Sequence, residues 1–291
     1  MGVVEAPEVI VAASPEEAVS AFGDGSDVTV VAGGTIVMPD ITHGRLRPRR
    51  ALLIGRAGLS HAYGHCSARL DEDTFVVSPA KPMGLVTAQD NPVTVPVRGP
   101  LPSGALGEVR LHQQIYRRRA DVRGIVRYQS PRIMSLSSLG RTPLARHGFG
   151  SYFAPHAPLW NDTRLIRDDD LAAAAADTLG NARAIVLRGN GAVAVGASLP
   201  EACVMAWYLE DAARVELDVL ATGLPGLVFD AEEAAARATT QGLIVERMWE
   251  WLTAGDPATG PPGLAERAAA GPRLDAVRRQ ARAVPLPPGV V

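Results

Sequence analysis

Ser67 and Arg69 are the first residues whose types and spacing suggest chemistry. They are two positions apart, so on a β-strand both side chains would lie on the same face. A serine hydroxyl and an arginine guanidinium that face the same way can bind an anion. The alternative is structural, with Arg69 paired to a nearby acid such as Asp71.

Glu108 and His112 form a second pair. Their four-residue spacing is about one turn of an α-helix, so both side chains would point the same way from a helix. We therefore consider Glu108 a candidate site residue. The alternative is that Glu108 is a carboxylate at the N-terminus of that helix, where the helix dipole stabilises it.

The elements around these residues alternate between strands and helices, which is typical of an α/β fold. Runs of β-branched and small apolar residues predict the strands, and helical periodicity predicts the helices. The predicted strands are 74–77, 184–187 and 192–195, with a hairpin arm at 90–97; the predicted helices are 168–179, 201–221 and 232–252.

Composition limits the classes of function. The chain has 291 residues, of which 47% are hydrophobic, and a net charge of −2. The near-neutral balance gives no indication of nucleic-acid or anionic-membrane binding. No apolar run approaches the roughly 20 residues that cross a bilayer, and the start of the chain lacks the features of a signal peptide. Cys66 and Cys203 form neither a disulfide framework nor a metal-ligand pattern, so we expect a cytoplasmic protein.

Four stretches resemble, in order and spacing, the landmarks of the class II aldolase/adducin family. They are 61–69, 107–112, 126–130 and 187–196. The resemblance implies a three-layer α/β/α domain over residues 51–252, followed by a Pro- and Ala-rich tail at 253–291. It also implies a homo-oligomer, a tetramer with sites between subunits, to which a neighbour's loop could contribute His147, Tyr152 or His156.

The resemblance also implies roles for individual residues. Glu108 matches the glutamate that acts as catalytic acid/base in the family, and His112 matches the histidine that follows it. Ser67 and Arg69 fall in the family's Gly-[His/Asn]-x-Ser-x-Arg motif, and Ser78 falls in a loop that binds phosphate or carboxylate. These residues, with His112, are predicted to bind substrate. The family's phosphate-binding serine pair is absent before Glu108, which argues against a phosphorylated sugar.

All three metal-binding histidines of the family are replaced. Arg127 and Gln129 stand where the family shows His-x-His, and Asn190 stands where it shows a histidine between small turn residues. Arginine has no lone pair to offer a metal, and zinc prefers nitrogen and sulfur to an amide oxygen. The sequence therefore predicts that the zinc site is lost, and it assigns no metal ligand.

The replacements are polar and would form a pocket around Glu108. There Arg127 could act with it in catalysis, and Gln129 and Asn190 could hold the oxygens of a carboxylate or enolate. One alternative is a Glu108–Arg127 salt bridge that fills a dead site. Another is a metal site rebuilt from histidines, namely His65, His112, His147 or His156.

Residues 1–50 resemble the opening of the FAD-binding subunit of molybdenum hydroxylases. The resemblance rests on Ser14-Pro-Glu-Glu-Ala, Ala32-Gly-Gly-Thr35 and Arg45-Leu-Arg-Pro48. The rest of that FAD domain is absent, so we expect a small βαβ-like appendage and no bound FAD.

The function predicted from the sequence is that of a divergent lyase, an aldolase or decarboxylase. It would act without zinc on a small, non-phosphorylated oxo- or hydroxy-acid, using Glu108 and Arg127. The expected partner is thus a small carboxylate, with no nucleic acid and no membrane. The alternative is a non-catalytic protein that serves oligomerisation, like adducin, or that assists a molybdenum hydroxylase.

Overall fold

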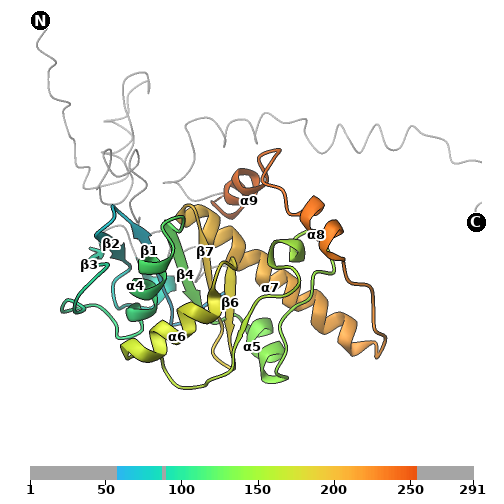
Figure 1. The fold of residues 1–291 in the computed structure, drawn as a ribbon, viewed down its shortest axis with the longest axis horizontal. Coiled ribbons are helices and arrows are strands. Elements are labelled where there is room, and N and C mark those ends of the chain that lie inside the picture. The colour runs from blue at the N-terminus through green and yellow to red at the C-terminus, as the bar shows by residue number, and fades with distance from the viewer. Residues whose placement is uncertain (1–57, 87–89, 254–291) are drawn as a thin grey trace, which may run out of the picture.

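A computed structural model describes residues 58–86 and 90–253. Its centre is a seven-stranded sheet in the order β3-β2-β1-β4-β7-β6-β5 (Figure 1). Neighbouring strands are antiparallel except β5 and β6, which are parallel. The strands are β1 (His65–Arg69), β2 (Thr74–Val77), β3 (Val93–Pro96), β4 (Gly124–Tyr128), β5 (Leu159–Trp160), β6 (Ala184–Leu187) and β7 (Ala192–Gly196).

Helices cover both faces of this sheet, which gives three layers (Figure 1). One face carries α4 (Val109–Arg118) and α6 (Asp169–Leu179), which pack on each other. The other carries the long α7 (Leu199–Ala221), and α5 (Pro131–Ser138) and α9 (Ile244–Thr253) pack against α7. The remaining helical elements are η1 (Met83–Leu85), η2 (Gly150–Phe153) and α8 (Ala231–Arg237). The predicted three-layer α/β/α fold is confirmed.

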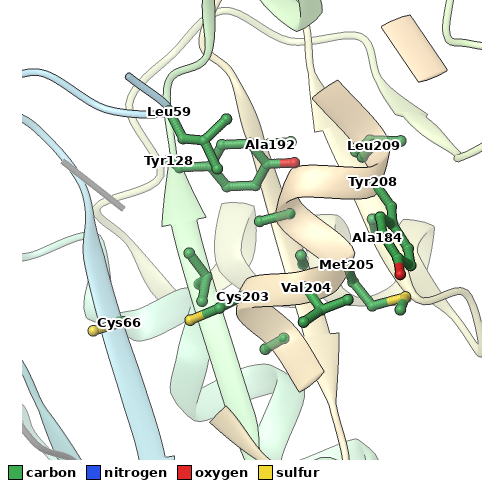
Figure 2. Close-up of a cluster of buried hydrophobic side chains, with 14 of the residues drawn as sticks. Leu59, Cys66, Tyr128, Ala184, Ala192, Cys203, Val204, Met205, Tyr208 and Leu209 are labelled. Carbon is green, nitrogen blue, oxygen red and sulfur yellow. The ribbon is translucent and has the colours of Figure 1, made fainter. Parts of the chain in front are cut away.

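Strand alternation divides the central side chains between two cores. Even-numbered residues of β1 and β4, such as Cys66 and Tyr128, belong to the core under α7 (Figure 2). The odd-numbered Ile125 belongs to the core under α4 and α6. Because successive strand residues point to opposite faces, His65 and Arg127 face the α4 side. The strand pattern thus directs polar residues of β1 and β4 toward α4.

Most predicted element boundaries agree with the structure. The strands at 74–77 and 184–187 are found with those bounds, and the predicted arm at 90–97 contains β3, which pairs with β2. Asp168 is the N-cap of α6, because its side chain accepts a hydrogen bond from the Leu171 amide. Helix α7 starts two residues earlier than predicted, at Leu199, and is capped by Ser198.

The predicted single helix at 232–252 is wrong. The chain forms two helices there, α8 and α9, with an irregular segment at 238–243 between them. Gly242 and Leu243 have φ values of +73° and +58°, which a right-handed helix excludes. The carbonyl of Thr239 accepts a hydrogen bond from the Tyr152 hydroxyl, at 2.5 Å, so the break is also tied to η2.

Two sequence predictions lie outside the described residues. These are the appendage at 1–50, with its resemblance to a flavin-binding subunit, and the tail beyond Thr253. Within the described residues, none of the helices combines the length and the apolar character that a membrane span requires.

Candidate functional site

A pocket lies on the face of the sheet that α4 covers. It is at the end of the sheet where β4 and β6 finish and β1 and β7 begin. Its polar side chains come from β1, from β4, from the turn between β6 and β7, and from the N-terminus of α4. Apolar side chains form the rest of the wall. The lining residues are His65, Glu108, Arg127 and Asn190, with Leu111, Ile166 and Leu187.

Arg127 and His65 lie side by side because they are partners across β1 and β4. Directly opposed residues of an antiparallel pair project to the same face of the sheet. The Arg127 guanidinium is buried, and its Nη1 donates a hydrogen bond to the Tyr128 carbonyl at 2.9 Å. Burial lowers the pKa of Arg127 to about 10, while the nearby Glu108 acts in the opposite direction. Arg127 therefore stays positively charged at neutral pH.

Glu108 precedes the first residue of α4 and faces the pocket from the helix N-terminus. Its Oε1 accepts a hydrogen bond from Nε of Arg167, at 2.8 Å. The Arg167 side chain is 61% exposed, so this pair is at the surface. The ion pair of Glu108 is therefore with Arg167, and the alternative in which Glu108 and Arg127 fill the site with a mutual salt bridge is not what the structure shows.

Asn190 reaches the pocket from the tight turn between β6 and β7. Its Oδ1 accepts a hydrogen bond from Nε2 of Gln129, at 2.7 Å. Gly189 and Gly191 on either side have φ values of +65° and +81°. Glycine adopts these values without the steric cost that other residues have. The glycines thus form the turn that places Asn190 beside Gln129.

This donor set does not fit the zinc ion that the family resemblance implies. Arg127 offers no lone pair, and the amides of Gln129 and Asn190 are hydrogen-bonded to each other. In the residues described, no three histidine, cysteine or acidic side chains are grouped so that they could hold a metal. We therefore derive no chemistry through a metal at these positions.

The other predicted binding residues lie outside the pocket lining. Ser67 Oγ lies 2.6 Å from His112 Nδ1 and is hydrogen-bonded inside the protein. Arg69 donates to the carbonyls of α4 and of the segment that follows it, and Ser78 Oγ accepts from the Cys66 amide at 3.2 Å. The structure thus brings Glu108, Arg127 and Asn190 together in the pocket lining, with Gln129 hydrogen-bonded to Asn190. It does not bring Ser67, Arg69, Ser78 or His112 to the lining.

His65 is a pocket residue that the sequence interpretation considered only as a possible metal ligand. Its ring is buried and its centroid lies 4.6 Å from that of His112. Burial, together with the neighbouring Arg127, lowers the pKa of His65 to about 3. The signal that could have found it is the strand alternation shared with Ser67. His65 is therefore neutral at physiological pH.

This low pKa predicts an acid-sensitive fold. The pKa is about 6.5 in the unfolded chain and about 3 in the folded one, so below pH 6.5 the unfolded chain binds more protons. The contribution of neutral His65 to the stability of the fold is fully present above pH 6.5 and is lost progressively as the pH falls toward 3. From His65 alone, the free energy of unfolding at about pH 5 should be roughly 2 kcal/mol lower than at about pH 8.

Urea unfolding of wild type and His65→Gln at both pH values checks this prediction. The variant keeps His112, so the difference between the two proteins isolates His65. An equal pH dependence in both proteins would show that His65 is not held neutral by the fold.

Comparison with known proteins places this geometry in a family. The model of the Class II Aldolase and Adducin N-terminal domain matches residues 49–217. The 3,4-dihydroxyphthalate decarboxylase of Arthrobacter keyseri is 26% identical over 210 residues, covering 63% of this chain and 82% of that protein. The enzyme of the same name from Terrabacter sp. (strain DBF63) is 28% identical over 200 residues, covering 62% and 82%.

A solved structure agrees with the fold. The L-fuculose 1-phosphate aldolase from Glaciozyma antarctica PI12 matches with a TM-score of 0.60 at 21% identity, covering 75% of this chain and 94% of that one. The family model spans more than half of the chain. The chain therefore belongs to the class II aldolase and adducin N-terminal domain family.

Proposed function

We propose that this protein is a decarboxylase of small hydroxylated aromatic acids. The observation that carries the proposal is the buried, positively charged Arg127 in the lining of a pocket that Glu108 also lines. A guanidinium binds a carboxylate through paired, charge-assisted hydrogen bonds. The similarity to 3,4-dihydroxyphthalate decarboxylases supports this substrate class.

Arg127 and Glu108 can divide the chemistry between them. Arg127 binds a carboxylate of the substrate, and Glu108 accepts the proton of a ring hydroxyl next to the carboxylate that is lost. Electron density from the resulting phenolate makes the adjacent ring carbon basic, and Glu108 returns the proton to that carbon. The carbon–carbon bond then breaks, its electron pair returns to the ring, and CO₂ leaves. The phenolate finally takes a proton from water.

The apolar wall of the pocket favours the same reaction. Leu111, Ile166 and Leu187 are buried, and they line the pocket together with the polar groups. An aromatic ring packs well against such side chains. An anionic carboxylate loses hydration when it enters, whereas the CO₂ that forms is neutral. The wall therefore penalises the reactant more than the product.

We also propose that the protein acts as a cytoplasmic homo-oligomer, a tetramer. Two separate exposed apolar side chains support an assembly, because Leu227, in the segment after α7, is 91% exposed and Trp251 of α9 is 60% exposed. The molar mass of the full-length protein, measured by light scattering, tests this: a mass of four chains is expected, and a monomer would refute it.

A decarboxylation assay tests the proposed function. Full-length protein is incubated with 3,4-dihydroxyphthalate and with aliphatic oxo- and hydroxy-acids, and the released CO₂ is measured. We expect release from the hydroxylated aromatic acid, and a loss of at least about 100-fold in the Glu108→Gln variant, which cannot carry the proton. If none of the acids releases CO₂ above the rate in buffer, the proposal is wrong.

A further inference from the structure

Behind the pocket, His65 is connected to a row of buried polar groups that the proposed reaction does not use. His112 Nδ1 lies 2.6 Å from Ser67 Oγ, and Ser67 Oγ lies 2.9 Å from the Tyr116 hydroxyl. His112 Nε2 and His65 Nδ1 are both sealed from solvent and have no hydrogen-bond partner among the described residues. The two rings are 4.6 Å apart.

The direction of the hydrogen bonds in this row can be worked out. In the described part of the chain, Ser67 is the one hydrogen-bond partner of the Tyr116 hydroxyl. Tyr116 must therefore donate to Ser67, because a buried hydroxyl proton without an acceptor is costly. Ser67 has one proton and donates it to His112 Nδ1. Neutral His112 then carries its proton on Nε2.

The neutral His65 ring also has a preferred position for its proton. Its Nδ1 is buried without a hydrogen-bond partner among the described residues, and its ring centroid lies 4.6 Å from that of His112, whose unpartnered Nε2 carries a proton. A neutral imidazole has one donor and one acceptor nitrogen. The favoured neutral tautomer of His65 therefore has Nδ1 as the acceptor and carries the ring proton on Nε2. Because Nδ1 is sealed and the ring lines the pocket, the Nε2 edge is the one a ligand can meet.

We propose that His65 is the residue that recognises the ring hydroxyl next to the substrate's carboxylate, by donating a hydrogen bond from Nε2 to the hydroxyl oxygen while Arg127 holds the carboxylate. This inference rests on the proposed function for its substrate class. It assigns the site a preference for acids with an ortho-hydroxyl, such as salicylate, over the same acids without it.

The positions of the two residues match this pair of substrate groups. His65 and Arg127 are cross-strand partners on one face of the sheet, so a cation and a neutral donor lie next to each other. In the proposed reaction the proton of this hydroxyl goes to Glu108, which leaves the hydroxyl oxygen as an acceptor. A neutral donor beside a guanidinium suits that arrangement. As the phenolate forms, the same donor stabilises the negative charge.

Binding of two matched acids tests the proposal separately from the decarboxylation assay. The dissociation constants of salicylate and benzoate are measured by calorimetry for the full-length wild type, His65→Leu and His65→Asn. We expect wild type to bind salicylate roughly tenfold more tightly than benzoate, the upper end of what one neutral hydrogen bond provides. The ratio should fall to about one in His65→Leu and be intermediate in His65→Asn, which keeps an N–H donor.

Each outcome decides the matter. A salicylate preference that persists in His65→Leu overturns the proposal, as does a wild type that binds neither acid or both equally. If the ratio is lost in His65→Leu but no aromatic acid releases CO₂, His65 recognises the hydroxyl and the proposed function is wrong. If CO₂ is released but the ratio does not depend on His65, the proposed function stands and this inference fails.

Nitrogen NMR of the wild-type protein provides a second test, which does not depend on whether a His65 variant folds. Ring ¹⁵N shifts distinguish the two neutral tautomers of histidine. We expect His65 and His112 to carry their protons on Nε2, and a proton on Nδ1 of His65 would overturn the proposal.

Discussion

The Arg127→Met variant is expected to lose carboxylate binding and decarboxylation while it keeps its stability. Arg127 supplies the buried positive charge of the pocket, and methionine fills a similar length without charge. Loss of a guanidinium that binds the reacting anion should lower kcat/KM by at least about 100-fold. Desolvation already lowers the pKa of Arg127, so its removal relieves an unfavourable burial. The free energy of unfolding should stay within about 1 kcal/mol of wild type or rise.

Two measurements and one control separate function from folding. CO₂ release and urea unfolding are measured on the same preparations, with Arg164→Met as the matched variant. Arg164 has a 70% exposed side chain and is paired with Asp162, outside the pocket lining. The Arg164→Met variant should keep wild-type activity. If Arg127→Met unfolds, or if it decarboxylates like wild type, Arg127 does not have the role assigned to it.

The Gly191→Ala variant should be among the most destabilised single substitutions in the domain. The φ of Gly191 is +81°, and a Cβ there would overlap the Tyr128 carbonyl oxygen and lie 2.7 Å from Gln129 Cα. The left-handed conformation alone costs an alanine roughly 1–2 kcal/mol. The overlap is with backbone at the end of the β4–β7 pairing, where Tyr128 is paired with Ala192, and paired backbone cannot move cheaply. A total loss of about 4 kcal/mol is expected, typical of forced backbone strain.

Gly189→Ala is the matched control for this prediction. Gly189 has a similar φ, +65°, but a Cβ there would meet nothing within 4 Å. It should lose only the conformational term of roughly 1–2 kcal/mol. Both variants are compared by urea unfolding. Equal losses would mean that the close approach to β4 contributes nothing.

The fold could be predicted well because local patterns and the order of motifs agree. Runs such as Ala184–Leu187 have small, apolar residues in a short segment, and the structure places a buried strand there. The prediction failed at 238–243, where Gly242 has a positive φ and Thr239 accepts a hydrogen bond from Tyr152, so that α8 and α9 are separate. That contact joins residues far apart in the chain, so no local pattern contains it.

The site was predicted less completely, for a similar reason. Glu108, Arg127 and Asn190 come together at one edge of the sheet, whereas Arg69 donates to backbone carbonyls of α4 and the segment after it. Strand alternation tells which face a residue occupies, but not whether a helix already covers it. His65 and Ser67 share a face, yet His65 lies in the pocket and Ser67 lies under α4. That distinction depends on where α4 begins, because the pocket lies at its N-terminus.

The most direct test of the central claim is the metal requirement of decarboxylation. Full-length protein is dialysed against a chelator, its metal content is measured, and CO₂ release from 3,4-dihydroxyphthalate is followed with and without added zinc. A site based on Glu108 and Arg127 predicts an undiminished rate in metal-depleted protein and no gain from zinc. A rate that is lost on chelation and restored by one equivalent of metal would contradict the account.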